Sequence, residues 1–208
     1  MNIVKVIKER VRHHLILQSV SDMFERIGIT IIPYYLFQEF VSDKLDLDLE
    51  PKLNPVVAGF LSYSEIEKLC LLPESRDLEL DMDKLLWDGC RCFALKYNED
   101  IVSYMLCDFH SCDSRLTSFP LNKDEVYLSG AFTFSAHRGK NLAAVLEHEL
   151  YKKLYDMSMT KYYSINVLFN TPGLKFKKKL KSRPLKLCLY IRLLGKYQWN
   201  ITLKRYRR

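Results

Sequence analysis

The stretch Ser135-Ala136-His137-Arg138-Gly139-Lys140-Asn141-Leu142-Ala143 decides the fold that this sequence predicts. It follows an apolar run, residues 126–134, that is typical of a strand, and it opens a pattern that is typical of a helix. Gly139 and Asn141 both tolerate positive φ angles. Such a turn can direct successive backbone N–H groups and a helix N-terminus toward one anion. We therefore expect a phosphate-binding loop between a strand and a helix.

The composition is that of a globular protein with an anionic partner. A chain of 208 residues that is 48% hydrophobic can form one sizeable domain. Its net charge of +7 favours a nucleotide cofactor, an acidic carrier protein, nucleic acid or a membrane surface as partner. The basic segments carry no recognisable motif for reading bases, so nucleic-acid binding is not expected.

The cysteines indicate a reducing compartment and no metal site. Cys92, Cys107 and Cys188 lie within apolar runs, as reduced thiols in a protein core do. No second pair of Cys or His residues accompanies Cys90 and Cys92 at the spacing that a zinc site requires. The chain shows no signal peptide and no apolar run near the ~20 residues of a membrane span. We expect a cytoplasmic protein without bound metal or membrane span.

Two parts are expected along the chain, an N-terminal helical and extended arm of residues 1–55 and a domain of residues 56–208. Apolar and polar periodicity predicts the elements of both parts. They are one or two amphipathic helices in residues 1–28, strands at 29–37 and 56–60, helices near 64–70 and 77–87, a hairpin of 91–97 and 101–107, a strand at 126–134, a helix from 142 to 154, a strand at 162–169, a basic helix at 174–181 and a hairpin of 187–193 and 197–203.

The loop resembles a known motif. Its spacing Arg138-x-x-Asn141-x-Ala143 resembles Q/R-x-x-G-x-G/A, the pyrophosphate loop of the GNAT superfamily of acyl-CoA-dependent N-acyltransferases, with Asn141 at the first Gly position. The order of elements from about residue 56 to residue 205 also resembles that superfamily. The resemblance implies an α+β fold of three layers, in which helices flank a central, mostly antiparallel, splayed mixed sheet.

A second segment resembles the same superfamily. Residues 170–180, Asn-Thr-Pro-Gly-Leu-Lys-Phe-Lys-Lys-Lys-Leu, are similar to its segment N-x-x-S/A-x-x-F/Y-x-x-x-L. The resemblance implies that Asn170 lies beside the pantetheine arm of the cofactor. Many members place a tyrosine, the acid for the leaving thiolate, seven residues after this Asn. Lys177 occupies that position here, so the usual acid is missing.

The resemblance implies acetyl-CoA or another acyl-CoA as donor substrate. The strand edge would hold the pantetheine and offer an N–H to the oxyanion, while the loop would bind the diphosphate. The residues expected to bind the cofactor are Phe132, Thr133, Arg138, Gly139, Lys140, Asn141, Leu142, Ala143 and Asn170.

The sequence leaves the catalytic residues unassigned. Asp108, His110 and Glu125 are candidates for a general base, and a water relay would also serve. The tyrosines at 127, 162 and 163 are interpreted as core or cleft wall rather than as proton donors. His148 and Glu149 are expected on a solvated helix face.

The predicted function is transfer of an acetyl or other acyl group from CoA to a primary amine, by direct attack of the amine on the thioester. One alternative is a long-chain N-acyltransferase that uses acyl carrier protein, because the basic segment 175–186 suits an acidic partner. Another alternative is a catalytically silent CoA-binding module. The acceptor, a small molecule or a protein amine, and the oligomeric state are left open.

Overall fold

The computed structural model describes residues 28–41, 53, 55–72, 74 and 89–206. The helices expected in residues 1–27 and 77–87 lie outside the described residues. The chain divides into two compact units. The first holds the described residues among 1–37, 165–177 and 183–208, and the second holds those among 38–164 and 178–182.

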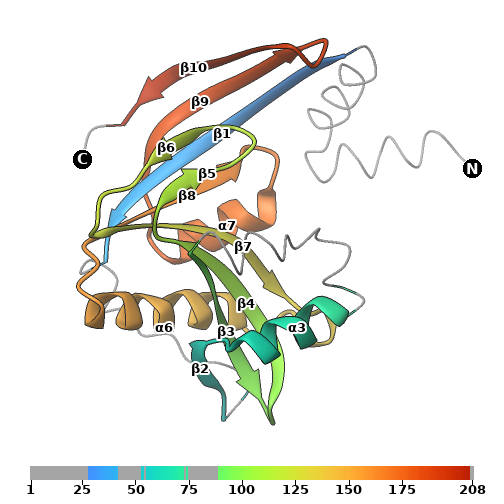
Figure 1. Cartoon of the computed structure of the whole chain (residues 1–208). Helices are drawn as coiled ribbons and strands as arrows, with labels where there is room; N and C mark the ends of the chain where they lie inside the picture. The colour runs from blue at the N-terminus through green and yellow to red at the C-terminus, as the bar shows by residue number, and fades with distance from the viewer. Residues whose placement is uncertain (1–27, 42–52, 54, 73, 75–88, 207–208) are drawn as a thin grey trace, which may run out of the picture. The chain divides into compact units, whose positions relative to one another are not determined.

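The described elements follow the predicted order (Figure 1). They are β1 (Ile29–Phe40), β2 (Val57–Phe60), α3 (Tyr63–Leu71), β3 (Cys90–Tyr97), β4 (Asp100–Asp108), β5 (Ser111–Asp113), β6 (Ser118–Pro120), β7 (Glu125–Thr133), the 3-10 helix η2 (Ser135–His137), α6 (Leu142–Asp156), β8 (Lys161–Val167), α7 (Thr171–Lys179), β9 (Pro184–Leu193) and β10 (Tyr197–Arg205). The short strands β5 and β6 form a hairpin between β4 and β7, where the sequence predicts no strand. No helix among the described residues is both long and apolar enough to cross a membrane.

The main sheet has eight strands in the order β10-β9-β1-β8-β7-β4-β3-β2. β7 and β8 run parallel and pair from Glu125 with Lys161 to Leu128 with Ser164, while the pairs β10·β9, β9·β1, β7·β4, β4·β3 and β3·β2 are antiparallel. The predicted mixed, mostly antiparallel sheet is therefore confirmed. β1 lies inside the sheet although its sequence falls within the expected arm of residues 1–55. The boundary at residue 55 stays a prediction.

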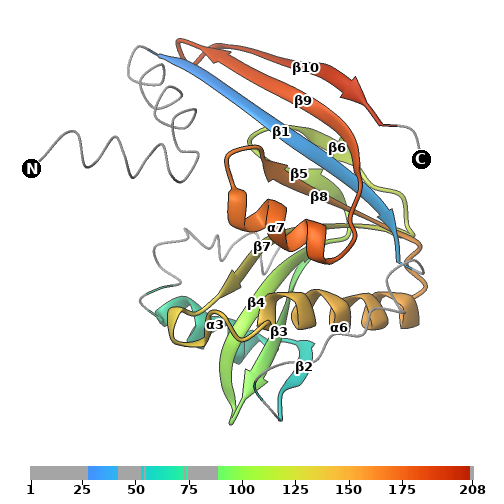
Figure 2. The ribbon, with the colours of Figure 1, turned by 180° about the vertical axis from the view of Figure 1, so that it is seen from behind.

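The core of the second unit lies on both faces of its sheet. Side chains alternate along β3, so Phe93 and Leu95 join a cluster with α6, whereas Cys92 and Ala94 join a cluster with α3. The two opposite views show α6 and α3 on opposite faces of β3 and β4 (Figures 1 and 2). The cysteines are free, and five of the six are buried, as expected for core-filling thiols.

A buried polar chain crosses the α6 side of this unit. The hydroxyl of Tyr162 donates to the Glu39 carboxylate at 2.8 Å, and the hydroxyl of Tyr151 has two acceptors within reach for its one proton, the oxygen of Tyr162 at 2.9 Å and the Glu147 carboxylate. Burial is the main cause that raises the pKa of both tyrosines well above 10. Both phenols therefore remain protonated donors in this chain.

Helix α3 begins with a charged cap. The backbone N–H and hydroxyl of Ser62 each donate to Glu65 Oε2 at 2.7 Å, and Lys96 donates to the other carboxylate oxygen. The hydrogen bond from Lys96, followed by those from Ser62, lowers the pKa of Glu65 to about 2. The carboxylate thus stabilises the first turn of α3 in its ionised form.

Candidate functional site

A β-bulge in β7 shapes the strand that leads into the predicted loop. Tyr104 and Leu106 of β4 pair with Phe132 and Ser129, so β7 has one more residue than β4 between these pairs. Gly130 lies in this bulge with φ +61°, in the left-handed region that favours glycine. The bulge changes the direction of the strand just before the residues expected to contact pantetheine.

Phe132 and Thr133, the expected pantetheine residues, form the end of β7. The hydroxyl of Ser103 donates to the Phe132 carbonyl at 2.7 Å and lies 2.9 Å from Thr133 Oγ1. A carbonyl oxygen has two lone pairs, so the Phe132 carbonyl can accept a second hydrogen bond. Ser103 therefore fixes this strand end on the side of β4.

The predicted loop is confirmed as a strand-to-helix junction. After η2, Gly139 has φ +76°, and a Cβ added there would meet no atom within 4 Å. Asn141 is the N-cap of α6 and has φ 66° and ψ 8°, while its carbonyl accepts the Val145 N–H at 3.3 Å. Because the first N–H groups of a helix have no partner within it, the first turn of α6 can donate to an anion at this loop.

The Arg138 side chain contacts the end of β7. Its Nε donates to the Thr133 carbonyl at 3.0 Å, and its guanidinium lies 5.5 Å from the centroid of the Phe132 ring. Among the other predicted loop residues, Leu142 is buried in the core and Lys140 is partly exposed. The positive charges of this segment therefore flank its backbone rather than fill the core.

Lys179 is a loop contact that sequence reasoning missed. Its ammonium donates a hydrogen bond to Asn141 Oδ1, although the two residues are 38 positions apart. Lys179 belongs to the dense basic run whose members the sequence did not distinguish from one another. The helical register of α7 places this lysine, and not Lys178, on Asn141.

The start of η2 already binds a carboxylate of the chain. Glu74 accepts the backbone N–H of Ser135 at 3.0 Å and its hydroxyl at 2.7 Å, and the Arg138 guanidinium lies 3.9 Å from the same carboxylate. The hydrogen bonds from Ser135 are the main cause that lowers the pKa of Glu74. An anionic oxygen is thus stabilised at the N-terminal side of the loop.

In the first unit, Asn170 caps α7. Its Oδ1 accepts the Gly173 N–H at 3.0 Å, as the Asn-x-x-Gly spacing predicts. A Cβ at Gly173 would lie 2.4 Å from the Nδ2 atom of Asn166, a buried side chain, so only glycine fits between the two amides. The Asn170 side chain therefore has a structural role before any ligand is considered.

Lys177, at the position of the usual tyrosine acid, is buried. It retains 6% of its exposure, and its ammonium lies 5.8 Å from the Phe37 ring centroid and 5.7 Å from that of Phe176. Both distances are within the range of cation–π attraction. A buried ammonium between two aromatic rings thus replaces a phenol in this chain.

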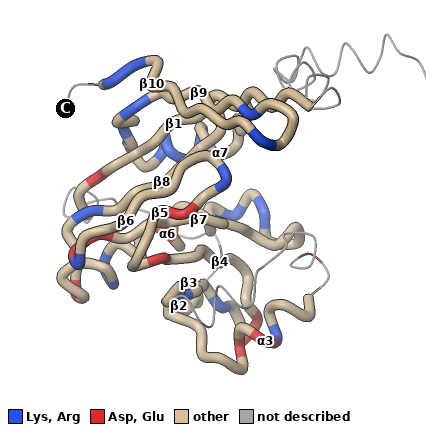
Figure 3. Tube along the Cα trace, turned by 45° about the horizontal axis from the view of Figure 1, so that its top comes forward, with Lys and Arg blue, Asp and Glu red and all other residues tan. Residues whose placement is uncertain are grey.

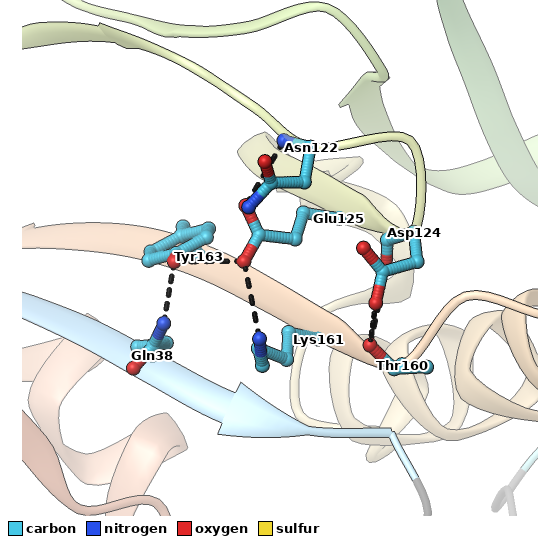
Figure 4. A network of polar contacts seen from close by, with 7 residues as sticks. All are labelled: Gln38, Asn122, Asp124, Glu125, Thr160, Lys161 and Tyr163. Carbon is cyan, nitrogen blue, oxygen red and sulfur yellow. Dashed lines mark hydrogen bonds and ion pairs between the residues drawn. The ribbon is translucent and has the colours of Figure 1, made fainter.

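Two of the candidate bases anchor loops. Asp108 Oδ1 accepts the N–H groups of His110 and Ser111 at 2.8 and 2.9 Å. Glu125 accepts the backbone and side-chain N–H groups of Asn122, both at 3.0 Å, the Tyr163 hydroxyl at 3.2 Å and Lys161 at 3.4 Å. Figure 4 shows these donors reaching Glu125 from the loop before β7 and from β8. Both carboxylates are thus engaged in holding neighbouring segments of the chain.

Of the remaining candidates, His110 is exposed, whereas the tyrosines and His148 are buried. Tyr127, Tyr162 and Tyr163 belong to the core, as interpreted from the sequence, and burial raises the pKa of Tyr127. His148 is 5% exposed, so the expectation that it lies on a solvated face is wrong. Helix α6 is covered by the sheet over a wider arc than its apolar residues alone indicate. No group of three or more His, Cys, Asp and Glu residues within the described part of the chain could hold a metal ion.

Comparisons with known proteins bear on the fold. The sequence matches no protein family model and no curated protein. A GCN5-related N-acetyltransferase from Kribbella flavida has a similar structure, with a TM-score of 0.58 and 13% identity over 81% of this chain and 61% of that one. A GCN5-related N-acetyltransferase-like protein from Streptococcus suis 89/1591 has a TM-score of 0.53 and 19% identity over 83% and 67%.

A functionally unknown conserved protein from Staphylococcus epidermidis ATCC 12228 is also similar, with a TM-score of 0.55 and 9% identity over 82% of this chain. The chain spans 64% of the length of that protein and 61% of that of the Kribbella enzyme. Identities this low establish the fold and not the activity. The strand order, the parallel β7·β8 pair and these neighbours together show that the chain has the GNAT fold.

Proposed function

We propose that this chain binds a CoA thioester through the loop from Arg138 to Ala143 and transfers its acyl group to a primary amine. The observation that carries the proposal is Asn141 in the left-handed conformation at the N-cap of α6. At the position where the GNAT motif has glycine, this backbone conformation leaves the N–H groups of the first turn of α6 available to a diphosphate. Asn141 at the glycine position is thus compatible with the binding of a diphosphate by this loop.

Two neighbours of the loop support an anionic ligand. Lys179 donates a hydrogen bond to the side-chain oxygen of Asn141 and adds a positive charge beside the loop. Glu74 accepts the backbone N–H of Ser135, so this turn already stabilises an anionic oxygen. The charge of Lys179 favours a negatively charged group at the N-terminus of α6, and the Glu74 contact shows that the N–H of Ser135 can donate to an anionic oxygen.

The proposed reaction is attack of a neutral amine on the thioester carbonyl. A C–N bond forms, the carbonyl oxygen becomes an oxyanion, and the C–S bond breaks as the thiolate leaves. A backbone N–H near the bulge, at Phe132 or Thr133, would stabilise the oxyanion, and Asn170 would border the pantetheine. The amine proton leaves to a base, and the thiolate takes up a proton. The donor is acetyl-CoA or another acyl-CoA, and the acceptor is a small-molecule or protein amine.

The reduced state of the cysteines supports a cytoplasmic location for this reaction.

The proposal is tested by native mass spectrometry for bound CoA and by thiol release from acetyl-CoA and longer acyl-CoAs with a panel of amines. We expect release with at least one amine, rising with pH as the amine deprotonates. CoA binding without turnover would indicate a silent module, and absence of CoA binding would contradict the proposal.

A further inference from the structure

One face of the sheet formed by β1, β9 and β10 is apolar on all three strands. Paired residues of neighbouring strands point to the same face, so the register defines this face rung by rung. The three rungs are Ile29, Leu193 and Tyr197; Ile31, Ile191 and Trp199; and Pro33, Leu189 and Ile201. We call these nine residues, all of which belong to the first unit, the apolar face.

The apolar face is more exposed than its polarity predicts. On the opposite face Tyr34, Cys188 and Tyr190 are buried, and Tyr34 exchanges hydrogen bonds with the amide of Asn200 at 2.7 and 3.0 Å. None of the nine residues of the apolar face is fully buried, and Trp199 retains 47% of its exposure. Contiguous exposed apolar surface of this kind marks an interaction site.

The chain around the apolar face is positively charged. From Met157 to Arg208 the sequence contains lysines and arginines but no aspartate or glutamate. Figure 3 shows only positively charged positions along β9 and β10. Lys196 lies in the turn beside Tyr197, and Lys204 follows Leu203 at the other end of β10, so positive charge borders the apolar face at both ends.

We propose that the apolar face docks on the surface of a bilayer that contains anionic lipids. Trp and Tyr favour the interface between headgroups and acyl chains, and aliphatic side chains such as Ile201 gain free energy there. Lysines at the rim of such a face are attracted to anionic headgroups. The apolar face includes none of the residues proposed to bind CoA, so the inference does not depend on acyl transfer.

Two other occupants fit the observations less well. A nucleic acid would use the aromatic rings and the lysines, but it has no use for exposed Leu and Ile side chains. A second copy of the chain would bring the same positive charge against this face, which opposes association. Both are distinguished from a lipid surface in the experiment below.

The experiment uses the whole chain with vesicles of phosphatidylcholine, with or without phosphatidylserine. We expect sedimentation with the anionic vesicles only, weakening with salt, together with a blue shift of tryptophan fluorescence. Trp199→Phe should remove the shift. Ile201→Asn should reduce binding, whereas Leu71→Asn, at a more exposed apolar position on α3, should not. Lys204→Gln should weaken binding about fivefold, and Lys152→Gln on α6 should leave it unchanged.

Circular dichroism first establishes that each variant is folded. Failure of the wild-type chain to bind anionic vesicles would overturn the proposal, and so would equal effects of Ile201→Asn and Leu71→Asn. A fluorescence shift that follows protein concentration without vesicles, with a dimer in sedimentation velocity, would assign the face to a second copy. Binding of labelled single-stranded DNA, lost in Lys204→Gln and without vesicle binding, would assign it to nucleic acid.

Discussion

The Lys179 ammonium donates a hydrogen bond to the side-chain oxygen of Asn141, the residue that replaces the first glycine of the GNAT loop motif. Glycine has no side chain to position, whereas asparagine at this point could turn its carbonyl oxygen toward a bound anion. The contact with Lys179 pairs that oxygen with a positive charge. If the loop binds CoA as proposed, Lys179 is a positioning residue for Asn141.

Lys179→Met should weaken CoA binding by about 1.5–3 kcal/mol, the usual contribution of a hydrogen bond to a charged group. Titration calorimetry measures the change, with unfolding curves to establish that stability is retained. Lys178→Met is the matched control, because it removes the same charge from the neighbouring position of α7. Equal losses in both variants would reduce the role of Lys179 to that of general positive charge.

Gly130→Ala should lower the free energy of unfolding by about 1–2 kcal/mol, the cost of a left-handed conformation for a residue with a Cβ. Its φ is +61°, and the added Cβ would lie 3.2 Å from Leu106 Cγ. Urea unfolding measures the loss. Gly59→Ala on β2, where a Cβ meets nothing within 4 Å, should cost nothing. A neutral Gly130→Ala would mean that the bulge does not need glycine.

Tyr162→Phe should destabilise the second unit by about 1–3 kcal/mol, because the buried Glu39 carboxylate and the Tyr151 hydroxyl each lose a partner. Tyr155→Phe removes a hydroxyl from an exposed position on α6 and should change stability little. Thermal unfolding of the two variants compares them directly. Equal stability of both would show that the buried polar chain contributes nothing to the fold.

The pH dependence of stability should reveal the Glu65 cap. The pKa of Glu65 is lowered from 4.5 to about 2 in the folded chain. Between these two pH values the carboxylate binds fewer protons in the folded chain than in the unfolded chain. The stabilisation is therefore complete above pH 4.5 and disappears as the pH falls toward 2. The difference in unfolding free energy between wild type and Glu65→Gln should shrink over that interval. A difference independent of pH would contradict this account of the cap.

The sequence predicts most of the fold because its elements have strong periodicity. The hairpin of β3 and β4 and the amphipathic α6 are local patterns, and the loop at Asn141 is identified by the residue types that positive φ requires. The β5·β6 hairpin is missed because strands of three residues carry no period. The burial of His148 is missed because it depends on how much of α6 the sheet covers.

The candidate site is predicted less completely. Lys179 and Glu74 reach the loop from distant parts of the sequence, and no local pattern distinguishes either from other surface charges. The bulge at Gly130 is a mismatch between two strands and becomes visible only in their register. The roles of Asp108 and Glu125 depend on donors from neighbouring loops, which spacing along the chain does not show.

The central claim, that the loop at the start of α6 binds the diphosphate of CoA, is tested most directly by titration calorimetry of CoA with three forms of the chain. Asn141→Gly introduces the glycine of the GNAT loop motif that this segment resembles, and should retain CoA binding. Asn141→Glu places a carboxylate against the diphosphate and should weaken binding by several kcal/mol, with the low-dielectric Coulomb energy as the upper limit. A folded Asn141→Glu variant that binds CoA as tightly as the wild-type chain would contradict the account.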